Sequence, residues 1–591
     1  MSAASQLPPS TDDRSVSEAR ELVERAHAAF QKFQHFTAEQ VDRVIDAMAA
    51  AATANAEKLA RMAVEETGYG RVEDKVQKNL FSSRRVYEAV RAMKTVGVVH
   101  EDAGLGVIEV AVPVGVVAAI LPSTYPTSTA IYKILIALKG RNTIVVSPHP
   151  SAMRCTCEVV SLMRQAAIAA GAPEDVICCF QSPSMAGTQE LMKHRRTAVV
   201  LATGGMGMVR AAYSSGKPAF GVGPGNVPAF IERTADVKKA VADIVFGKTF
   251  DYGTICSSEQ AMVAEEAVRE AVMEELRRNH AYFLSPEEIE TVGKQMVNLE
   301  AHTINPKFVG KSATRVAELA GFRVPEATRV LVAQLAGVGR EHPLSAEKLS
   351  PVLALYFTPD RAVAFDLCER LLRFGGLGHT VVIHSRDDQA IREFGVRMPA
   401  GRIVVNSPAP QGSIGASTNL FPAMTLGCGA MGGNITSDNI SPMHLVNLKR
   451  VAYEKRPASV AEPAVAAAVT APAAAATAAV ACACGSEKTV EPVASALPER
   501  MAAARAVERF LAGRPAASPP PPAVAKHAAP APAAPAASLR PRPRPVDFVS
   551  VVEVELALKR KEKILVGPRT IITPAARDLA AGRGVLVIAE S

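Results

Sequence analysis

Residues 114–129 read VGVVAAILPSTYPTST, and this stretch decides the fold. Its first half, 114–121, is a short apolar run rich in β-branched residues, which is typical of a strand buried on both faces. Its second half carries many hydroxyl groups and leads into a helix-forming segment. These hydroxyls and the first backbone N–H groups of the helix are expected at the carboxyl edge of a sheet. The stretch therefore predicts a ligand-binding loop.

The same alternation of strand and helix continues along the chain. Segments with helical spacing of apolar residues, at 128–138, 151–170 and 206–215, separate short β-rich runs. This order predicts parallel strands joined by right-handed helical crossovers, the doubly wound α/β architecture that binds nucleotides at its strand ends. Residues 15–96, which precede it, are predicted to be helical. The further predicted strands are 143–146, 176–180, 197–201, 260–263, 352–356, 380–384 and 403–406.

The composition argues against two classes of function. The net charge is +8, but the basic residues are spread along the chain and Trp is absent, so no nucleic-acid site is predicted. The longest uncharged run, 464–485, is almost entirely Ala and Val, and Ala contributes little to membrane insertion. No membrane span is predicted.

The cysteines give a first indication of the compartment. The chain has nine cysteines and no signal peptide, which predicts free thiols in a reducing compartment. Most of them lie in apolar, periodic segments and are interpreted as small buried side chains. These are Cys155, Cys157, Cys178, Cys179 and Cys368.

Cys256 differs from the other cysteines because of the residues around it. It lies in the stretch 250–260, FDYGTICSSEQ, after a glycine-bearing turn and before a polar Ser-Ser-Glu-Gln segment. A thiol in this position can lie near backbone N–H donors, which lower its pKa and stabilise an anion formed beside it. We therefore predict that Cys256 is a nucleophile, with an inert buried cysteine as the alternative.

Two glycine-rich turns accompany this cysteine. Thr203-Gly204-Gly205 follows a predicted strand and begins a helix, where backbone N–H groups can approach phosphate. This turn and the second one, Gly223-Pro224-Gly225-Asn226, are weak signals when taken singly. Their order among the other motifs is far more specific. That order is the Pro122 loop, Ser147-Pro148-His149-Pro150, Thr203-Gly204-Gly205, Gly223-Pro224-Gly225-Asn226, Cys256 and Glu347-Lys348-Leu349-Ser350-Pro351.

From about residue 15 to residue 456 the chain resembles the aldehyde dehydrogenase superfamily. Within it, the chain is most similar to the CoA-acylating branch, as in the aldehyde dehydrogenase half of bifunctional aldehyde/alcohol dehydrogenases. The residues that carry the resemblance are 126–130, 147–150, 213–218, the Cys256 stretch, 376–380, 425–429 and 432–434.

The resemblance implies an aldehyde dehydrogenase-like α/β fold with a Rossmann-type cofactor domain, an α/β catalytic domain and a β-arm that pairs subunits into a homo-oligomer. The arm strands are expected near 104–112 and 440–451. The expected divisions are an NAD-binding domain over 15–235, a catalytic domain over 236–425, a return to the cofactor and oligomerisation region over 426–455, a linker over 456–545 and a small α/β segment over 546–591.

The resemblance also implies a chemistry. Cys256 would attack a short-chain aldehyde, a hydride would pass to NAD, and coenzyme A would then take the acyl group from the cysteinyl thioester. The backbone N–H of Cys256 and the hydroxyl of Thr124 would stabilise the oxyanion. The sequence does not decide between NAD and NADP.

The same resemblance assigns residues to the cofactor. Glu347 would hold the nicotinamide-side ribose, and Thr203, Gly204 and Gly205 would lie against the pyrophosphate. Ser147 stands where hydrolytic relatives often carry a lysine for the adenosine ribose. The remaining assignments to the cofactor site are Pro122, Gly223 and His149, and for His149 a surface loop residue is an equal alternative.

The absence of a catalytic carboxylate motif favours acyl transfer over hydrolysis. Hydrolytic relatives activate water with a carboxylate in a Glu-Leu-Gly-Gly motif, whereas this chain has residues 223–226, GPGN, in that region. Two rival interpretations stay open: a hydrolytic enzyme that makes a free acid, and a non-catalytic scaffold. Tyr125 and Tyr252 stand where relatives often carry Asn, and they could narrow the pocket or add hydroxyl donors. For His379 a structural hydrogen-bonding role is favoured over catalysis.

The tail suggests a location in the cell. Residues 456–545 are rich in Ala and Pro, which is typical of a linker, and 497–511 form one amphipathic helical pattern within them. This pattern resembles the encapsulation peptides of enzymes in bacterial microcompartments, and 546–591 resemble segments of other microcompartment enzymes. We expect a location in the bacterial cytoplasm, within a microcompartment, with a shell protein as partner. A transient helix without a role is the alternative.

Overall fold

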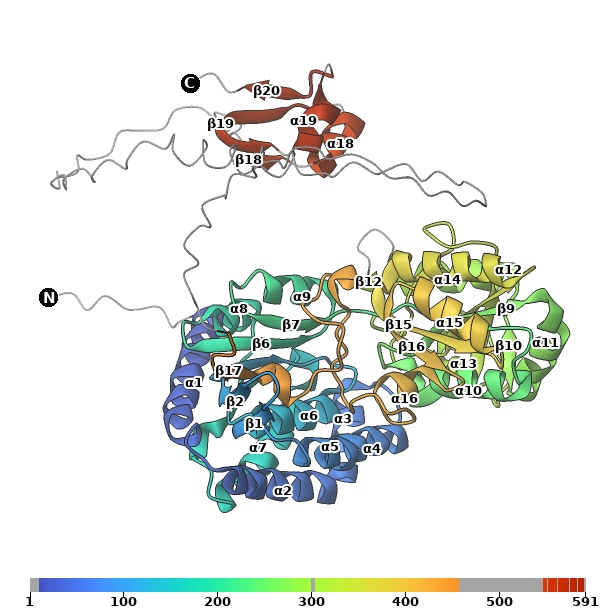
Figure 1. Cartoon of the computed structure of the whole chain (residues 1–591). Helices are drawn as coiled ribbons and strands as arrows, with labels where there is room; N and C mark the ends of the chain where they lie inside the picture. The colour runs from blue at the N-terminus through green and yellow to red at the C-terminus, as the bar shows by residue number, and fades with distance from the viewer. Residues whose placement is uncertain are drawn as a thin grey trace, which may run out of the picture. The chain divides into compact units, whose positions relative to one another are not determined.

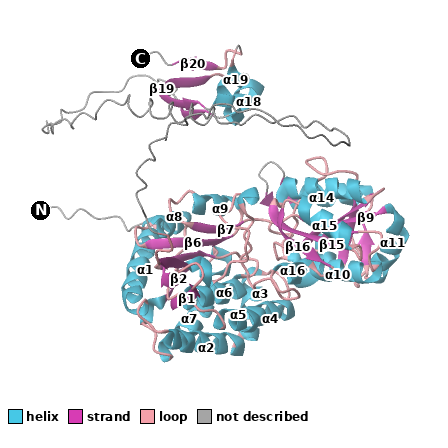
Figure 2. Ribbon diagram, viewed as in Figure 1, coloured by secondary structure: helices cyan, strands magenta, loops and turns pink. Residues whose placement is uncertain are grey.

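The computed structural model describes residues 10–298, 303–456 and 546–588, apart from 550, 561, 573 and 582. They form two compact units, one up to residue 456 and one within 546–588, and each is described by itself (Figures 1 and 2). The expected linker at 456–545 and its amphipathic helix at 497–511 lie outside the described residues, Arg456 excepted. No helix among the described residues is both long enough and apolar enough to cross a membrane.

The first sheet has five parallel strands in the order β5-β4-β3-β6-β7. The chain runs outward from β3 through β4 to β5 and then returns to place β6 on the other side of β3. This reversal opens a crevice at the carboxyl ends of β3 and β6, where doubly wound sheets bind ligands. The strands are β3 (Val116–Ile120), β4 (Thr143–Ser147), β5 (Ile177–Cys179), β6 (Thr197–Thr203) and β7 (Ala219–Val222).

Helices cover both faces of this sheet, as the alternation of strand and helix predicts. Alternate residues of the central strand contribute to two cores, with Val117 and Ala119 in one and Val116 and Ala118 in the other. Figure 1 shows α8 and α9 on one side of β6 and β7, and α6 and α7 on the other. The helices are α1 (Thr11–Phe33), α2 (Ala38–Ala54), α3 (Ala56–Thr67), α4 (Val72–Leu80), the π-helix η1 (Phe81–Val86), α5 (Tyr87–Arg91), α6 (Pro126–Lys139), η2 (Pro150–Ala152), α7 (Met153–Ala169), η3 (Glu174–Val176), α8 (Met185–Lys193) and α9 (Met206–Tyr213).

The second sheet has seven parallel strands in the order β10-β13-β14-β9-β8-β15-β16. It also has a core on each face. Its strands are β8 (Val227–Ile231), β9 (Glu259–Glu265), β10 (Ala281–Phe283), β13 (Val330–Gln334), β14 (Val352–Thr358), β15 (Gly378–His384) and β16 (Ala400–Val405). Its helices are α10 (Val237–Thr249), η4 (Phe250–Gly253), η5 (Glu266–Val268), α11 (Arg269–Arg278), α12 (Pro286–Met296), α13 (Ala313–Ala320), η6 (Pro343–Ser345), α14 (Arg361–Gly375), α15 (Asp388–Arg397) and α16 (Ala409–Ser413).

A three-stranded antiparallel sheet joins segments that are far apart in sequence. β2 (Val107–Pro113) pairs on one side with β1 (Gly97–Asp102) and on the other with β17 (Val446–Ala452). β2 and β17 fall where the arm strands are expected, whereas β1 was not predicted. The remaining short elements of this unit are β11 (Val297–Asn298), β12 (Thr303–Ile304), η7 (Ala430–Gly432) and η8 (Pro442–Leu445).

The C-terminal unit is a small parallel sheet with two helices. β19 (Ile564–Ile572) lies between β18 (Val546–Val549) and β20 (Leu586–Ile588), and the connections are α18 (Val551–Arg560) and α19 (Pro574–Ala580). Buried side chains from both helices and from the strands form a separate hydrophobic core in this unit. The unit therefore has the α/β character that the sequence predicts for 546–591.

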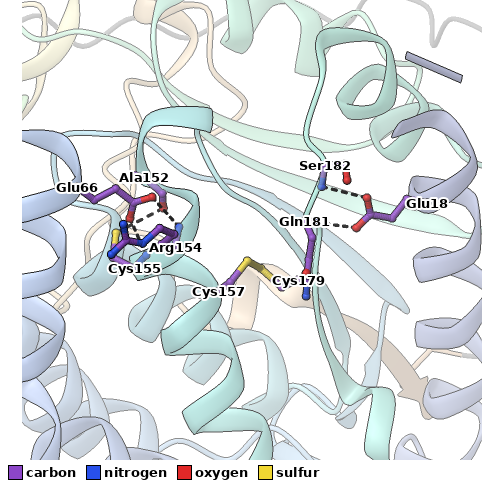
Figure 3. The surroundings of a disulfide bond; sticks show 9 residues. All are labelled: Glu18, Glu66, Ala152, Arg154, Cys155, Cys157, Cys179, Gln181 and Ser182. Atoms are coloured by element: carbon purple, nitrogen blue, oxygen red, sulfur yellow. Dashed lines mark hydrogen bonds between the residues drawn. A yellow bond between two sulfur atoms is a disulfide. The ribbon is translucent and has the colours of Figure 1, made fainter. Parts of the chain in front are cut away.

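Two of the cysteines form a disulfide, contrary to the expectation that all thiols are free. Cys157 of α7 is bonded to Cys179 at the end of β5, with a Cα to Cα distance of 5.8 Å (Figure 3). α7 packs against β5, so residues 22 positions apart meet across one helix-sheet contact. Neither residue lies in a motif that signals pairing, and the sequence therefore gave no indication of the bond. Cys155, Cys178, Cys256, Cys368 and Cys428 are free.

A buried ion cluster connects the N-terminal helices to the turn that precedes Cys256. The Asp251 carboxylate accepts hydrogen bonds from the ammonium groups of Lys75 (2.9 Å) and Lys78 (2.5 Å), both on α4. It also accepts the backbone N–H of Arg71 at 2.8 Å and the hydroxyl of Thr254 at 2.8 Å. Burial alone would raise the pKa of Asp251, but the two ammonium groups hold it below its usual range. The cluster therefore keeps its charges paired inside the protein.

Replacement of Asp251 by Asn should destabilise the fold strongly, because it leaves two buried ammonium groups without their counter-ion. We expect a loss of about 3 to 5 kcal/mol in the free energy of unfolding, measured from urea denaturation. Glu57→Gln is the matched control, because it breaks only the exposed Glu57–Arg61 pair on α3 and should leave the urea midpoint nearly unchanged.

The difference between the wild type and Asp251→Asn should shrink in acid. The depressed pKa means that the carboxylate stabilises the fold above its unfolded-state pKa of about 3.9 and loses this effect as the pH falls further. If Asp251→Asn and Glu57→Gln unfold at the same urea concentration, the cluster does not stabilise the fold as described.

Candidate active site

The candidate active site is a cavity of about 510 Å³ in the N-terminal unit. Loops at the carboxyl ends of β3, β4 and β6 line it, which places it at the reversal point of the first sheet. All of the site residues predicted from the sequence line this one cavity. They are Cys256, Thr124, Thr203, Gly204, Gly205, Ser147, His149, Pro122, Gly223 and Glu347.

The second sheet supplies its residues from the opposite end of its strands. Gly225 precedes β8, Cys256 precedes β9, Glu347 precedes β14, and His379 is the second residue of β15. A Cβ atom on Gly225 would lie 2.2 Å from the backbone oxygen of Cys256, so only glycine allows this close approach. The site is thus formed where the carboxyl edge of one parallel sheet meets the amino edge of another.

Two side chains lie against the sulfur of Cys256. The phenol of Tyr125 donates a hydrogen bond to the Sγ atom at 3.5 Å, and the Nε2 atom of His379 lies 3.3 Å from it. Burial raises the pKa of the Cys256 thiol to about 11; Glu347 adds to this effect, and the Tyr125 hydrogen bond, Arg402 and the residue's own backbone N–H oppose it. The sequence predicted a lowered pKa for Cys256, because it indicates nearby backbone N–H donors but does not indicate how deeply the thiol is buried.

Both ring nitrogens of His379 lie within hydrogen-bonding distance of a neighbour. Its Nδ1 atom lies 3.0 Å from the Thr380 hydroxyl oxygen, which also accepts a hydrogen bond from Arg402 at 3.3 Å. Burial, with the nearby Arg402 charge, lowers the pKa of His379 to about 3, so the ring is neutral. We assign the proton to Nδ1, where it is donated to Thr380, which leaves Nε2 as an acceptor for the thiol proton. The predicted structural role therefore understates this residue, which contacts the nucleophile directly.

In the loop after β3, Tyr125 contacts the sulfur, whereas the prediction assigned the hydroxyl of Thr124 to catalysis. Thr124 lines the cavity, and its backbone oxygen accepts a hydrogen bond from Lys75 at 2.8 Å. Its neighbour Tyr125 is the residue in contact with the sulfur. Tyr252, the other tyrosine noted in the sequence, is not among the residues that line this cavity. Lys75 and Lys78, which hold this loop and the turn before the nucleophile, are the contributors that the sequence analysis did not name.

The cavity fits a nicotinamide dinucleotide in its residue types. A Cβ atom on Gly205 would meet nothing within 4 Å, so the backbone before α9 faces open space that a phosphate could approach. The Glu347 carboxylate accepts the backbone N–H of Gly225 at 3.1 Å, and burial raises its pKa to about 7. Ser147 is buried beside Thr188, whereas His149 is exposed and its Nδ1 atom contacts Ser151. No group of His, Cys, Asp or Glu side chains within the described residues could hold a metal ion.

Alkylation of Cys256 should report its raised pKa. Because the thiolate is the reactive form, the rate of labelling by iodoacetamide should rise about tenfold per pH unit between about pH 7 and about pH 9. Mass spectrometry of the labelled peptide measures the rate, and Cys256→Ala gives the background from the other cysteines. A rate that levels off at or below about pH 8 would contradict the raised pKa.

These features define a class: an α/β enzyme in which two parallel sheets bring a cysteine sulfur beside a glycine-rich loop. The chain belongs to the aldehyde dehydrogenase family, and the family model matches residues 9–285. It is 40% identical to succinate-semialdehyde dehydrogenase (acetylating) of Clostridium kluyveri over 444 residues, which are 75% of this chain and 97% of that protein. The fold class predicted from the sequence is thereby confirmed.

Two further relatives are similar to most of this chain. It is 47% identical over 442 residues to the bifunctional aldehyde-alcohol dehydrogenase of Escherichia coli; the match covers 74% of this chain but only 49% of that protein, so the chain spans about half the length of this relative. The crystal structure of an acetylating aldehyde dehydrogenase from Geobacillus thermoglucosidasius superimposes with a TM-score of 0.74 and 50% identity, covering 76% of this chain and 99% of that one.

Two solved structures with lower sequence identity to this chain are also similar to it. One was determined with a ligand, and the other comes from a microcompartment. A propionaldehyde dehydrogenase of Rhodopseudomonas palustris, solved with bound CoA and an acylated cysteine, is 28% identical with a TM-score of 0.66; the match covers 74% of this chain and 97% of that one. A propionaldehyde dehydrogenase from a fucose utilisation microcompartment of Clostridium phytofermentans gives the same identity, TM-score and coverage.

Proposed function

We propose that this enzyme oxidises a short-chain aldehyde with NAD and coenzyme A, and releases an acyl-CoA and NADH. The observation that carries the proposal is the environment of Cys256. Its sulfur lies between two neutral hydrogen-bonding groups, and Glu347 is the single carboxylate among the described residues that line the cavity. The Oε1 atom of Glu347 accepts the Gly225 N–H, and we assign the other oxygen of this carboxylate to a cofactor ribose, so that no second carboxylate among the described lining residues is left to activate water.

The residues around the sulfur can carry both halves of such a reaction. In the first half, Cys256 forms a bond from sulfur to the aldehyde carbon, and the thiol proton is lost to water while Nε2 of His379 stays in hydrogen-bonding distance of the sulfur. A nicotinamide dinucleotide supplies the hydride acceptor when bound, which converts the adduct to a thioester on Cys256. In the second half, the thiol of coenzyme A attacks the thioester carbon, the bond to Cys256 breaks, and the cysteine recovers a proton. The relative solved with CoA and an acylated cysteine supports this order.

We assign the cofactor contacts as the sequence suggested. Thr203, Gly204 and Gly205 would hold the pyrophosphate, since this turn opens α9 and borders open space. Glu347 would accept hydrogen bonds from a ribose, for which its carboxylate has one oxygen still free of the Gly225 N–H. The remaining walls of the cofactor site would be formed by Pro122, Ser147, His149 and Gly223.

An assay of NADH absorbance with and without coenzyme A tests the function. With a short aldehyde and NAD alone, we expect a burst of about one equivalent of NADH per subunit, because the thioester waits for its thiol acceptor. Coenzyme A should then restore steady turnover. Cys256→Ser should abolish both phases, and Cys368→Ser, which changes a buried free cysteine, is the matched control. Full-speed turnover to a carboxylic acid without coenzyme A would replace this proposal with the hydrolytic alternative.

We further propose that the enzyme is a homo-oligomer packaged in a bacterial microcompartment. The exposed antiparallel sheet of β1, β2 and β17 offers a surface for subunit pairing. The packaging proposal is supported by the sequence pattern at 497–511, by a separate small unit at 546–588, and by a relative that comes from a microcompartment. A shell protein would be the partner of one of these two segments.

Removal of residues 457–591 should separate catalysis from packaging. We expect unchanged steady-state rates, because the cavity is formed entirely by residues up to Leu349, and loss of co-purification with shell proteins. Within the full chain, Phe510→Asp on the apolar face of the predicted helix should also lose co-purification. Arg505→Ala on its polar face is the control that should keep it. Co-purification that survives the truncation would refute the packaging proposal.

A further inference from the structure

The Tyr125 phenol is the best-placed hydroxyl for an oxyanion on the adduct of Cys256. The side chain is 5% exposed, and its O–H points at the sulfur from 3.5 Å. When the sulfur attacks a carbonyl carbon, the negative charge appears on the oxygen, which is two bonds from the sulfur. A donor that reaches the sulfur in the free enzyme is therefore close to this oxygen in the adduct.

The phenol is also held in place before any substrate arrives. The backbone oxygen of Tyr125 accepts hydrogen bonds from the hydroxyl of Thr129 at 2.7 Å and from its N–H at 3.3 Å, which fixes the residue at the start of α6. The ammonium group of Lys78 lies 5.3 Å from the centre of the ring and is bound in turn to Asp251. A donor fixed in this way needs little reorganisation when charge develops.

The phenol can act only as a donor of a hydrogen bond, and not as a base. Burial, together with the neighbouring Cys256 and Glu347, raises the pKa of Tyr125 well above its usual value. It therefore keeps its proton through the neutral range. Thr124, the residue first expected in this role, is anchored through its backbone oxygen to Lys75.

We propose that Tyr125 is a catalytic residue whose O–H moves its hydrogen bond from the Cys256 sulfur to the oxyanion of the thiohemiacetal. In this step the S–H bond breaks and its proton leaves to water, the bond from sulfur to carbon forms, and the carbonyl π-electron pair moves to oxygen, where the phenol donates a hydrogen bond without losing its own proton. A nicotinamide cofactor would supply the acceptor for the hydride that leaves the C–H bond as the carbonyl of the thioester reforms. The inference rests on the proposed function for its substrate, an aldehyde.

The first turnover of the full-length enzyme tests this role. The burst of NADH from aldehyde and NAD is measured without coenzyme A, so that it reports the oxidation step alone. We expect Tyr125→Phe to slow the burst by about 100- to 1000-fold, as removal of one oxyanion donor does. Tyr282→Phe, the control, removes a phenol hydroxyl that donates to Glu288 and not to the sulfur, and it should slow the burst less than about threefold.

Alkylation of Cys256 by iodoacetamide separates this role from a structural one, because that reaction forms no oxyanion. In Tyr125→Phe the alkylation rate should fall by about tenfold or less, because only the hydrogen bond to the sulfur is lost, and the retained labelling also shows that the folded site is kept. The proposal is overturned if Tyr125→Phe keeps the wild-type burst rate, or if its alkylation rate falls by the same factor as the burst. Failure of the proposed function appears separately, as wild-type turnover that does not need coenzyme A.

Discussion

The site depends on the buried carboxylate of Asp251. This one group holds two ammonium groups of α4, a backbone N–H and the hydroxyl of Thr254, which lies two residues before the nucleophile. The residue adopts a φ of 49°, in the left-handed region that is unfavourable for a side chain, and the ion cluster offsets this strain. Through Lys75 and Lys78 the same carboxylate reaches Thr124 and the ring of Tyr125. It therefore fixes both sides of the sulfur.

The arrangement of the two sheets explains why motifs far apart in the sequence meet in one cavity. The carboxyl ends of β3, β4 and β6 carry loops whose hydroxyls and glycines suit a nucleotide. The amino ends of β8, β9, β14 and β15 carry the glycine, the sulfur, the carboxylate and the imidazole. Because all strands within each sheet are parallel, each crossover returns the chain to the same edge. A single reversal point in the first sheet then opens the space between these edges.

The sequence predicted eight of the twelve strands in the two parallel sheets and missed β7, β8, β10 and β13. The residues that it assigned to catalysis and to the cofactor all line one cavity, because strand ends and glycine turns have local signatures. It could not predict contacts that depend on three-dimensional direction. Lys75 and Lys78 are three apart on a polar helix, a spacing that usually marks a solvent-facing side, and only the fold turns them inward. Thr124 and Tyr125 are neighbours in one loop, and the sequence does not tell which of them faces the sulfur. The disulfide of Cys157 and Cys179 lacked any local signal for the same reason.

The structure also separates paired charges from neutral reacting groups. The ions of the Asp251 cluster are compensated next to the site, where an unpaired charge would cost several kcal/mol in a buried place. At the sulfur itself the neighbours are a neutral phenol and a neutral imidazole, and the thiol is protonated because burial opposes its ionisation. Dipoles whose positions are fixed can stabilise a transient negative charge without stabilising a permanent one. The raised pKa of the resting cysteine leaves little thiolate at neutral pH, and the fixed donors favour the adduct in which the substrate oxygen receives the charge.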